Sequence, residues 1–464
     1  MRTPVAAAAA ALAVAAPLPA FAQAIDASEA AALRSQIREL RERLEALESR
    51  LAAQAPGTAA PESPAPDAAT APIPALASVQ APAPAPAPAA TPSPAGGKAF
   101  KMKGRIQADA GIVSAPSSLE DQGLGFSSEM RRIRLGAEGE LSPQFSYKLE
   151  VELSDNAVDL VDTFLTFEQG RWQVRVGNQN AFWSLDELTG DTSGSVMERA
   201  AFTDAFAFER RLGLGVQYTR GPLIAQLGVF TDDITALANS SDGTSGGDEN
   251  NSYSVDGRLV LNPRLGAVQL HLGGSAHWRR LGRLADASIR YRQRPFLHTT
   301  NTRLIGTPAL KVEHETMYGL ELAAIAGRWH GAGEYYALTA DRVGASPLTF
   351  RGAYAELGYF LTRGDSRGYK GGIFTNNAPA RPLGEGGPGS IQVNLRYDWL
   401  DLNDRDVRGG TQDAYIAGLI WTPIRNLRFH LDYALLRYTG ATALPSGDDS
   451  YDANVIGTRF ELDF

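Results

Sequence analysis

The last nine residues of the chain, 456–464 (IGTRFELDF), alternate without interruption and end on an aromatic side chain. In an extended strand this period of two places Ile, Thr, Phe and Leu on one face and Gly, Arg, Glu and Asp on the other. A soluble sheet could carry such a strand. An aromatic carboxyl terminus on an alternating final strand is more typical of an outer-membrane β-barrel, in which one face meets lipid and the other meets a polar lumen.

The amino terminus has the features of a secretory signal peptide. Arg2 is followed by an alanine-rich apolar run at residues 5–16 and then by Ala20-Phe21-Ala22, a small-x-small cleavage site. We expect cleavage after Ala22, so that residues 1–22 are the signal peptide. The run is shorter than the roughly 20 residues that a spanning helix needs, and no later stretch is that apolar. A membrane form of this chain must therefore be a barrel.

The composition narrows the classes of site that the chain can build. Cysteine is absent, which excludes a disulfide framework and a thiolate metal site. The net charge of -8 gives no indication of a nucleic-acid partner. Of the 44 basic residues only six are lysine. Arginine dominates, and its planar donor fork suits carboxylate, phosphate and other oxyanions.

Residues 23–54 are predicted to form a coiled-coil helix in the periplasm. Seven apolar residues are spaced alternately three and four apart: Ala30, Leu33, Ile37, Leu40, Leu44, Leu47 and Leu51. One helix of this length is marginal alone in water, so a partner is implied. The segment 43–48 (RLEALE) resembles the arginine-to-glutamate pattern of short trimeric coiled coils, which predicts a homotrimer. An amphipathic helix packed on another surface is the alternative.

Residues 55–98 are rich in alanine and proline and include an alternating Ala-Pro run at residues 81–88. Such a segment cannot bury a core, and it is stiffened toward polyproline II. At about 3.1 Å per residue it could reach on the order of 100 Å. Two interpretations stay open: a tether that brings the helix to peptidoglycan in the cell wall, and a passive spacer.

The remaining residues, 99–464, are predicted to form the barrel. The period of two recurs in segments of about ten residues, the length that a tilted membrane strand needs: 101–110, 130–141, 145–153, 172–176, 212–218, 268–278, 318–324, 329–337, 391–402, 414–421 and 427–436. Charged residues such as Arg132, Arg134, Glu138 and Glu140 share one face, which suits a water-filled lumen and not a dry core. Polar stretches at 239–251 and 441–451 suit external loops. About 365 residues at roughly 22 to 23 per strand and connection predict 16 antiparallel strands, with 14 and 18 as alternatives.

Several blocks of this region resemble the phosphate-selective porin O and P family of Gram-negative outer membranes, in the order in which the family has them. They are GFSSEMRRIRLGAEGEL with FSYKLEVEL (125–153), VGNQNAFWSLDELTGDTSGSVMERA (176–200), ERRLGLGV (209–216), YFLTRGDSRGY (359–369) and GGTQDAYIAGLIWTPIRNLRFHLDY (409–433). Two positions depart from the family pattern, because Asn180 stands where a lysine is common and Arg363 interrupts the LTGE block. The resemblance implies the fold and a porin role, with phosphate as the candidate substrate.

Conduction of an oxyanion needs several weak cationic sites in series, since one tight site would trap the ion. Arginines two apart on a strand share a face and lie about 6.6 Å apart. This spacing occurs in Arg290, Arg292 and Arg294 (RYRQR) and in Arg132 and Arg134. The family resemblance implies an arginine ladder that leads to a constriction, and we assign these five arginines to it. Arg199 and Arg210 are assigned to the constriction formed by an inward-folded loop, with Arg211 expected to point elsewhere.

An alternative stays open for these arginines, because arginine in a barrel wall often pairs with glutamate across neighbouring strands. Glu138, Glu150 and Glu152 could neutralise Arg132 and Arg134 in this way. Enzyme signatures are poor, and no cofactor or metal site is indicated. His271 and His277 share a strand face, but they are interpreted as hydrogen-bonded wall residues and not as metal ligands. No serine, histidine and acid set stands out.

The sequence therefore predicts an all-β outer-membrane porin for the passive diffusion of small anions, phosphate among them, through an arginine-lined pore. Its partners would be those anions, outer-membrane lipid and two further copies of the chain. A general, weakly selective porin is the first alternative. The second is a structural anchor that ties the envelope to the cell wall, and a lipid-modifying enzyme of the outer membrane is the remotest.

Overall fold

A computed structural model describes residues 100–119, 121–154, 157–231, 234, 252–281 and 288–464. The predicted signal peptide, helix 23–54, linker 55–98 and loop 239–251 lie outside these residues. Sixteen long strands are present in the described part of the chain: β1 (Phe100–Ser114), β2 (Gly125–Ser142), β3 (Phe145–Glu152), β4 (Asp159–Gln169), β5 (Trp172–Asn180), β6 (Arg210–Arg220), β7 (Leu223–Phe230), β8 (Tyr253–Leu261), β10 (Val268–Arg280), β13 (Val312–Ala326), β14 (Trp329–Arg342), β15 (Leu348–Phe360), β18 (Ser390–Asp404), β19 (Val407–Ile424), β20 (Leu427–Thr439) and β21 (Tyr451–Asp463).

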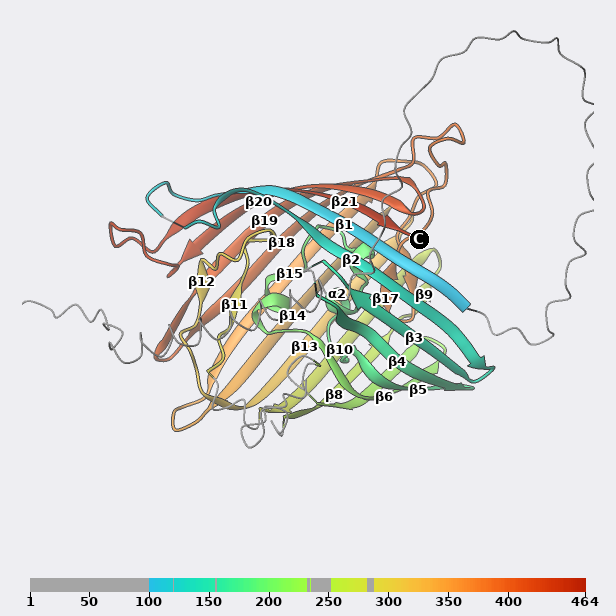
Figure 1. Ribbon diagram of the computed structural model, residues 1–464, viewed down its shortest axis with the longest axis horizontal. Helices are drawn as coiled ribbons and strands as arrows, with labels where there is room; N and C mark the ends of the chain where they lie inside the picture. The colour runs from blue at the N-terminus through green and yellow to red at the C-terminus, as the bar shows by residue number, and fades with distance from the viewer. Residues whose placement is uncertain (1–99, 120, 155–156, 232–233, 235–251, 282–287) are drawn as a thin grey trace, which may run out of the picture. The chain divides into compact units, whose positions relative to one another are not determined.

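These sixteen strands form one closed antiparallel barrel (Figure 1). Each long strand pairs with the next one along the chain, and β21 pairs with β1 to close the ring. The predicted fold class and strand number are confirmed. Among the described residues, no helix is both long and apolar enough to cross a membrane.

The alternation that predicted the strands separates the two faces of the barrel wall. In β21, Arg459 and Glu461 point inward and keep 2% and 0% of their surface exposed, whereas Ile456 and Phe460 point outward and keep 49% and 36%. Large apolar side chains are thus on the outside and charged ones on the inside. This is the reverse of a soluble protein and the expected arrangement for a barrel in lipid.

The barrel closes where the end of the chain meets β1. The backbone N–H of Gly104 donates to the carbonyl of Phe464 at 2.9 Å, and the N–H of Phe464 donates to the carbonyl of Gly104 at 3.0 Å. The Phe464 ring covers Gly104 so closely that a Cβ there would lie 2.2 Å from the ring. A lipid-facing aromatic ring across a strand glycine is a known device for stabilising such a seam.

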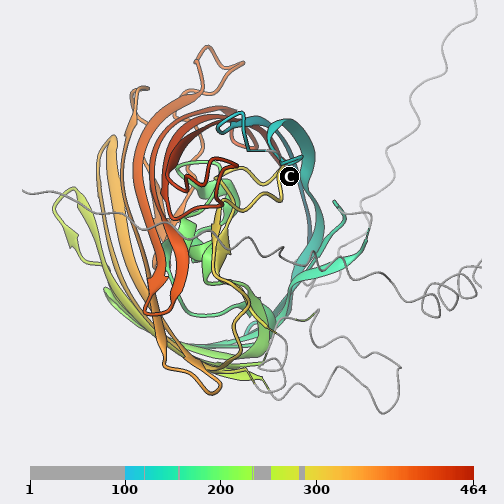
Figure 2. The same cartoon turned by 90° about the vertical axis from the view of Figure 1, so that its left-hand side faces the viewer.

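The two ends of the barrel differ. We call the end that holds Phe100 and Phe464 the proximal end and the other the distal end. Five proximal connections are two-residue turns, namely 143–144, 170–171, 221–222, 327–328 and 425–426. Three longer connections contribute to the interior, which Figure 2 shows along the barrel. They are the constriction loop (181–209, distal), the mouth segment (288–311, distal) and the proximal segment (361–389).

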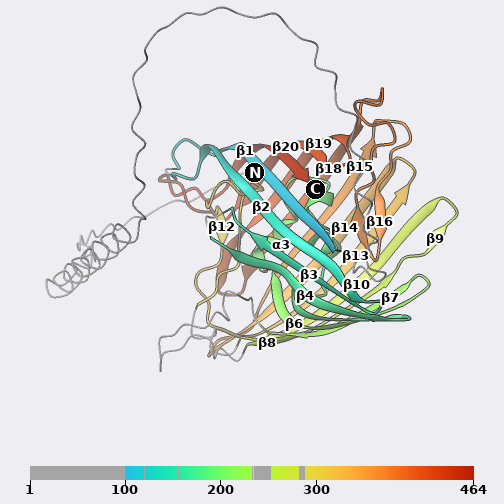
Figure 3. The ribbon, with the colours of Figure 1, turned by 45° about the vertical axis from the view of Figure 1, so that its right-hand side comes forward.

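Short elements shape these three connections. The constriction loop contains α2 (Leu185–Leu188), η1 (Asp191–Ser193) and α3 (Ala201–Ala205), and α3 is seen through the barrel wall in Figure 3. The mouth segment contains β11 (Arg292–Gln293) and β12 (Ile305–Gly306). The proximal segment contains β16 (Gly368–Lys370) and β17 (Ile373–Thr375), and β9 (Arg264–Leu265) extends the turn between β8 and β10.

An apolar cluster inside the barrel fixes the constriction loop to one side of the wall. Trp183 stacks on Phe208 at 4.9 Å between ring centroids, and Phe202 stacks on Tyr336 of β14 at 4.9 Å. All four residues are buried. The loop therefore lies against β13 to β15, which leaves the free interior on the side of β1 to β3.

The seam generates a stability prediction. Gly104→Val should force the Phe464 ring away and cost about 1–3 kcal/mol, the usual range for overpacking. The measurement is the temperature at which the folded band is lost on a detergent gel. Gly274→Val is the matched control, since a Cβ at this outward strand glycine meets its nearest atom only at 3.5 Å. Equal temperatures for the two variants would contradict the seam's role.

Candidate functional site

Carboxylates on the inner wall hold the backbone of the constriction loop. Glu334 accepts hydrogen bonds from the N–H groups of Leu185 at 2.9 Å and Asp186 at 2.7 Å. Three more carboxylates, on β15, β18 and β20, bind the loop in the same manner: Glu356 from Ser195 Oγ at 2.8 Å, Asp398 from Ala201 N at 3.2 Å and Asp432 from Met197 N at 2.6 Å. This half of the lumen is therefore an acidic wall whose charges are engaged by the loop.

The opposite half of the lumen is basic. Three arginines from β1 and β2 converge on one carboxylate of the loop, Asp191. Arg132 Nε lies 2.8 Å and Arg134 Nη1 lies 3.6 Å from Asp191 Oδ2, and Arg105 Nη1 contacts Oδ1. Burial alone would raise the pKa of Asp191, but the three guanidinium groups hold it well below its usual value. The carboxylate is therefore charged at neutral pH.

A β-bulge adds a fourth arginine that the sequence did not predict. The register between β1 and β2 shifts between Gln107 and Ala108, so Arg131 is the extra residue in β2. A bulge changes the alternation of side chains at this point. As a result Arg131 and Arg132, which are consecutive, line the same cavity. Arg131 Nε lies 3.9 Å from Glu198 Oε1 of the constriction loop.

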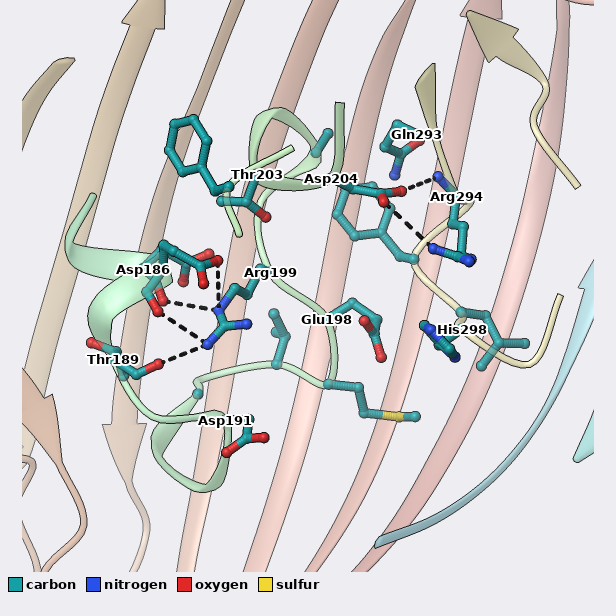
Figure 4. A pocket seen from close by; sticks show the side chains of 18 of the residues that line it. Asp186, Thr189, Asp191, Glu198, Arg199, Thr203, Asp204, Gln293, Arg294 and His298 are labelled. Carbon is teal, nitrogen blue, oxygen red and sulfur yellow. Dashed lines mark hydrogen bonds and ion pairs between the residues drawn. The ribbon is translucent and has the colours of Figure 1, made fainter. Parts of the chain in front are cut away.

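Two cavities lie on either side of the Asp191 cluster. The distal cavity, of about 240 Å³, is enclosed by β2, the constriction loop and the mouth segment, and Figure 4 shows it from close by. Arg132 and Asp191 belong to its lining. The proximal cavity, of about 650 Å³, includes Arg105 and Arg134 in its lining. The cluster thus marks the constriction of the lumen.

The charges of the two cavities differ. The distal lining has six arginines and six carboxylates: Arg131, Arg132, Arg199, Arg294, Arg396 and Arg459 with Asp186, Glu187, Asp191, Glu198, Asp204 and Glu209. The proximal lining has six cationic side chains and three carboxylates: Lys101, Lys103, Arg105, Arg134, Lys148 and Arg425 with Glu138, Glu150 and Asp463. The proximal side is therefore the more cationic one.

The pairing predicted as an alternative holds for one of the two β2 arginines. Arg134 Nε bonds Glu152 at 2.8 Å, and its Nη1 lies 3.3 Å from Glu150, both across the neighbouring strand. Arg132 instead donates to Gln107 at 2.7 Å and pairs with Asp191. Glu138 pairs with Lys103 at 2.5 Å.

Arg199 lines the distal cavity, whereas Arg210 belongs to the lining of neither the distal nor the proximal cavity. Arg199 donates to the carbonyls of Asp186, Glu187 and Thr189 at 3.0 to 3.2 Å, and so caps the carboxyl end of α2 (Figure 4). Arg210 Nε donates to Asp162 at 2.7 Å, a carboxylate that also accepts from Lys148 at 2.5 Å.

Arg211, which was expected to point elsewhere, also points inward. It is buried, with its guanidinium carbon 5.4 Å from the centre of the Trp183 ring. Its stacking on a residue of the constriction loop makes it part of the packing behind that loop.

The prediction that Arg290, Arg292 and Arg294 share one strand is wrong. Only Arg292 and the next residue form a strand, β11, and all three arginines belong to the mouth segment rather than to the barrel wall. The physical reason is Pro295, which has no N–H for a ladder and follows directly. Arg290 and Arg292 are exposed, whereas Arg294 lines the distal cavity and lies 3.5 Å from Asp204 (Figure 4).

The proximal segment supports the constriction loop from the other end. Arg367 and Asn376 donate to the carbonyls of Ser193 and Thr192. The N–H of Phe374 donates to Thr189 Oγ1 at 3.3 Å. Residues from both ends of the barrel therefore meet inside it, next to Asp191. The sequence identified the 359–369 block through its family resemblance. It shows no alternation of apolar and polar residues that would predict that this segment folds into the barrel.

The two wall histidines are hydrogen-bonded, as interpreted from the sequence. His271 Nδ1 lies 2.7 Å from Tyr369 Oη and its Nε2 lies 3.1 Å from Glu321, and His277 Nδ1 lies 2.5 Å from Asp256. Within the described residues, no group of three or more His, Asp and Glu side chains is placed to hold a metal ion.

The chain is similar to one protein family, to a curated protein and to several solved structures. The model of the family described as "Phosphate-selective porin O and P" matches residues 100–464. A Caulobacter vibrioides protein, described as an uncharacterized protein, is 57% identical over 447 residues, covering 94% of this chain and 90% of its own. Two solved structures are similar at TM-scores of 0.49 and 0.47: an anion-selective porin from Comamonas acidovorans (11% identity, 79% of this chain, 100% of the porin) and the outer-membrane channel DcaP of Acinetobacter baumannii (11%, 79%, 98%).

Glu187 generates a pH prediction. Burial raises the pKa of this carboxyl group, on α2 in the distal cavity, to about 7, although Arg199 lies nearby. A raised pKa leaves the group neutral below about 7 and charged above it. As pH falls through that value the cavity loses a negative charge, so the anion-to-cation permeability ratio in a planar bilayer should rise.

The matched variants separate Glu187 from other titrating groups. Glu187→Gln should reduce the change, because the variant has no titrating carboxyl group at this position. Glu313→Gln, at an exposed carboxylate, should behave as the unmodified protein. An identical pH dependence in Glu187→Gln and the unmodified protein would contradict the assignment.

Proposed function

The chain belongs to the phosphate-selective porin O and P family and is an outer-membrane porin, and from this premise we propose that it conducts small anions by passive diffusion, with phosphate as the candidate substrate. The observation that supports anion preference best is the convergence of Arg105, Arg132 and Arg134 on the single carboxylate of Asp191. Arg134 also pairs with Glu150 and Glu152, so the excess of positive charge in this proposal comes from the adjoining proximal cavity, whose lining has six cationic side chains and three carboxylates.

Position makes this excess charge effective. The cluster is buried between the β1–β2 wall and the constriction loop, where water screens charge less than in bulk solution. An anion there is attracted and a cation repelled. The arginines of the distal cavity come before the cluster and the lysines of the proximal cavity come after it. Such a series of weak sites suits conduction, because no single site holds the ion tightly.

Phosphate is favoured by the chemistry of the side chains. Guanidinium groups present paired donors that match the oxygens of a tetrahedral oxyanion. Arg131 and Arg132 bring two such groups into one cavity through the bulge. The predicted roles of Arg199 and Arg210 are proposed here in a narrower form: each shapes the constriction through its own partners and adds to the local positive charge.

One observation favours a weakly selective porin as the second candidate. The distal cavity has as many carboxylates as arginines. An ion that enters from that side passes equal numbers of positive and negative side chains before it reaches the Asp191 cluster. The structural-anchor alternative depends on residues 23–98, which lie outside the described residues.

The arrangement in the envelope is part of the proposal. We place the proximal end in the periplasm, with the signal peptide removed and residues 23–54 forming a trimeric stalk there. The linker 55–98 would connect that stalk to the barrel and could bring it to peptidoglycan. These assignments depend on the sequence patterns alone.

The Asp191 cluster generates a selectivity prediction. Arg105→Gln combined with Arg132→Gln should lower the anion-to-cation permeability ratio by a factor on the order of ten. A passing ion that loses about 1.4 kcal/mol of interaction, roughly a third of the 4 kcal/mol between charges 4 Å apart at an effective dielectric constant near 20, binds tenfold less well. The measurement is the zero-current potential across a planar bilayer under a salt gradient. Arg437→Gln, an exposed arginine paired with Asp452, is the control.

Four outcomes separate the candidate functions. Anion preference in the unmodified protein, with chloride current reduced by added phosphate, is expected. Cation preference would reject the anion pore, and anion preference without any effect of phosphate would leave the weakly selective porin. A protein with no stepwise conductance would support the anchor.

The mouth segment generates a second prediction. Replacing Arg290, Arg292 and Arg294 by alanine should lower anion conductance at low salt and change it little at high salt, because exposed charges attract ions over a screening length that shrinks with ionic strength. The readout is the ratio of single-channel conductance in the variant and the unmodified protein across a salt series. A ratio that does not depend on salt would show that these arginines have no steering role.

A further inference from the structure

Four arginines, three of them exposed, occupy the proximal turns along one half of the barrel. Arg171, Arg220, Arg264 and Arg328 belong to the turns β4–β5, β6–β7, β8–β10 and β13–β14. The residues of these turns, 170–171, 220–222, 262–267 and 327–328, include no aspartate or glutamate. We call these four residues the arginine arc.

Neighbouring turns of the arc are joined through their backbones. The N–H of Thr219 donates to the carbonyl of Arg171 at 2.9 Å, and the N–H of Asn262 donates to the carbonyl of Pro222 at 2.8 Å. The first three arginines therefore lie on adjacent, connected turns. A ligand that spans two of these turns can meet two guanidinium groups.

Three of the four guanidinium groups of the arc have no partner among the described residues, in contrast to those of the lumen. Arg171, Arg220 and Arg264 make no side-chain hydrogen bond or ion pair with any residue that the structure describes. Arg328 lies 4.8 Å from the centre of the Tyr359 ring and donates to the carbonyl of Leu361 at 3.5 Å. Inside the barrel, by comparison, Arg258 and Arg459 bond carboxylates at 2.6 to 3.1 Å.

Aromatic side chains fix the depth of the arc in the membrane. Trp172 and Trp329 each follow an arc arginine directly, with 54% and 51% of their surfaces exposed. Their rings lie 4.8 Å from Tyr218 and 4.4 Å from Tyr359. Tryptophan and tyrosine gather at the boundary between hydrocarbon and headgroups. The arginines, one residue beyond, therefore lie at the level of headgroup phosphates.

An apolar groove on the outer wall lies above the same arc. It has a volume of about 720 Å³ and crosses β7, β8, β10, β13 and β14. Ala225, Gly257 and Gly274 form its floor, with Leu259 and Leu320 among its larger neighbours. From Gly257 to Asn262 along β8 is about 17 Å at 3.4 Å per residue, less in depth for a tilted strand. The groove is therefore within one leaflet of the arc.

We propose that this surface binds a glycerophospholipid with an anionic headgroup. Its phosphate pairs with Arg220 and Arg264, and one acyl chain fills the groove between β7 and β14. The free guanidinium groups and the lack of carboxylates select negative charge, and the apolar walls select a hydrocarbon chain. This inference depends on the proposed placement of the barrel in the outer membrane, but not on the ion that the pore conducts.

A lipid fits the surface better than a second copy of the chain does. Another copy would bring its own uncompensated arginine turns to the same depth, where like charges repel. It would also have to fill a concave slot with the convex outer wall of a barrel. An acyl chain is narrow and flexible and meets both requirements.

The test uses the full chain in detergent micelles that contain either phosphatidylglycerol or phosphatidylcholine with the same acyl chains. The lipid concentration that gives half of the rise in unfolding temperature is measured. The unmodified protein should need at least tenfold less phosphatidylglycerol than phosphatidylcholine. Arg220→Gln with Arg264→Gln should remove this preference, and Arg351→Gln with Arg437→Gln, two exposed arginines elsewhere on the wall, should keep it.

A groove variant tests the second half of the site. Gly274→Leu should raise the half-effect concentration of both lipids equally, because it occupies the chain slot and leaves the arginines intact. Equal responses of the unmodified protein to the two lipids, or an unchanged preference in the Arg220 and Arg264 variant, would overturn the proposal.

The bilayer measurement of ion selectivity is made on the same variants. If the protein prefers the anionic lipid but shows no anion selectivity, the proposed anion pore is rejected and the lipid site is not. If it is selective for anions but shows no lipid preference, the lipid site is rejected and the anion pore is not.

Discussion

Every inward-facing charge in this barrel needs a partner, and the way in which the partners are distributed determines the pore. The carboxylates of β14, β15, β18 and β20 accept hydrogen bonds from a loop. The arginines of β1 and β2 pair with Asp191 and Glu198 of the loop and with Glu150 and Glu152 of β3. Because burial makes an unpaired charge costly, the loop goes to the acidic side and the aqueous space stays on the basic side.

This division also explains why an acidic protein can have a basic constriction. The net charge of -8 describes the whole chain, in which many carboxylates are engaged as acceptors. Glu334 shows the principle, since both of its oxygens accept backbone N–H groups and one of them also accepts from Tyr354. Such a carboxylate holds the loop in place, and its charge has a smaller effect on the electrostatic potential at an ion in the lumen. The arginines around Asp191 contribute to that potential directly.

The strands of the barrel wall could be predicted from the sequence, whereas the arrangement of the segments inside the barrel could not. A period of two is a local property, so the final strand, the inward direction of Arg132 and Arg134 and the strand number could be predicted. The bulge at Arg131 depends on the pairing of β1 with β2, and no local pattern in RRIR separates it from a regular strand. The RYRQR segment has the alternation of a strand. It does not form a wall strand because Pro295 follows it and because the segment belongs to a distal connection.

The contacts of the constriction loop have a consequence for biogenesis. Its acceptors on β14, β15, β18 and β20 come between 148 and 235 residues later in the chain. The proximal segment that supports the loop comes equally late. A half-inserted barrel therefore offers residues 181–209 only the arginines of β1 and β2, without the acceptors of the later strands. We expect the loop to take its final position only after those strands have inserted, so that closure of the barrel would turn a leaky intermediate into a filter.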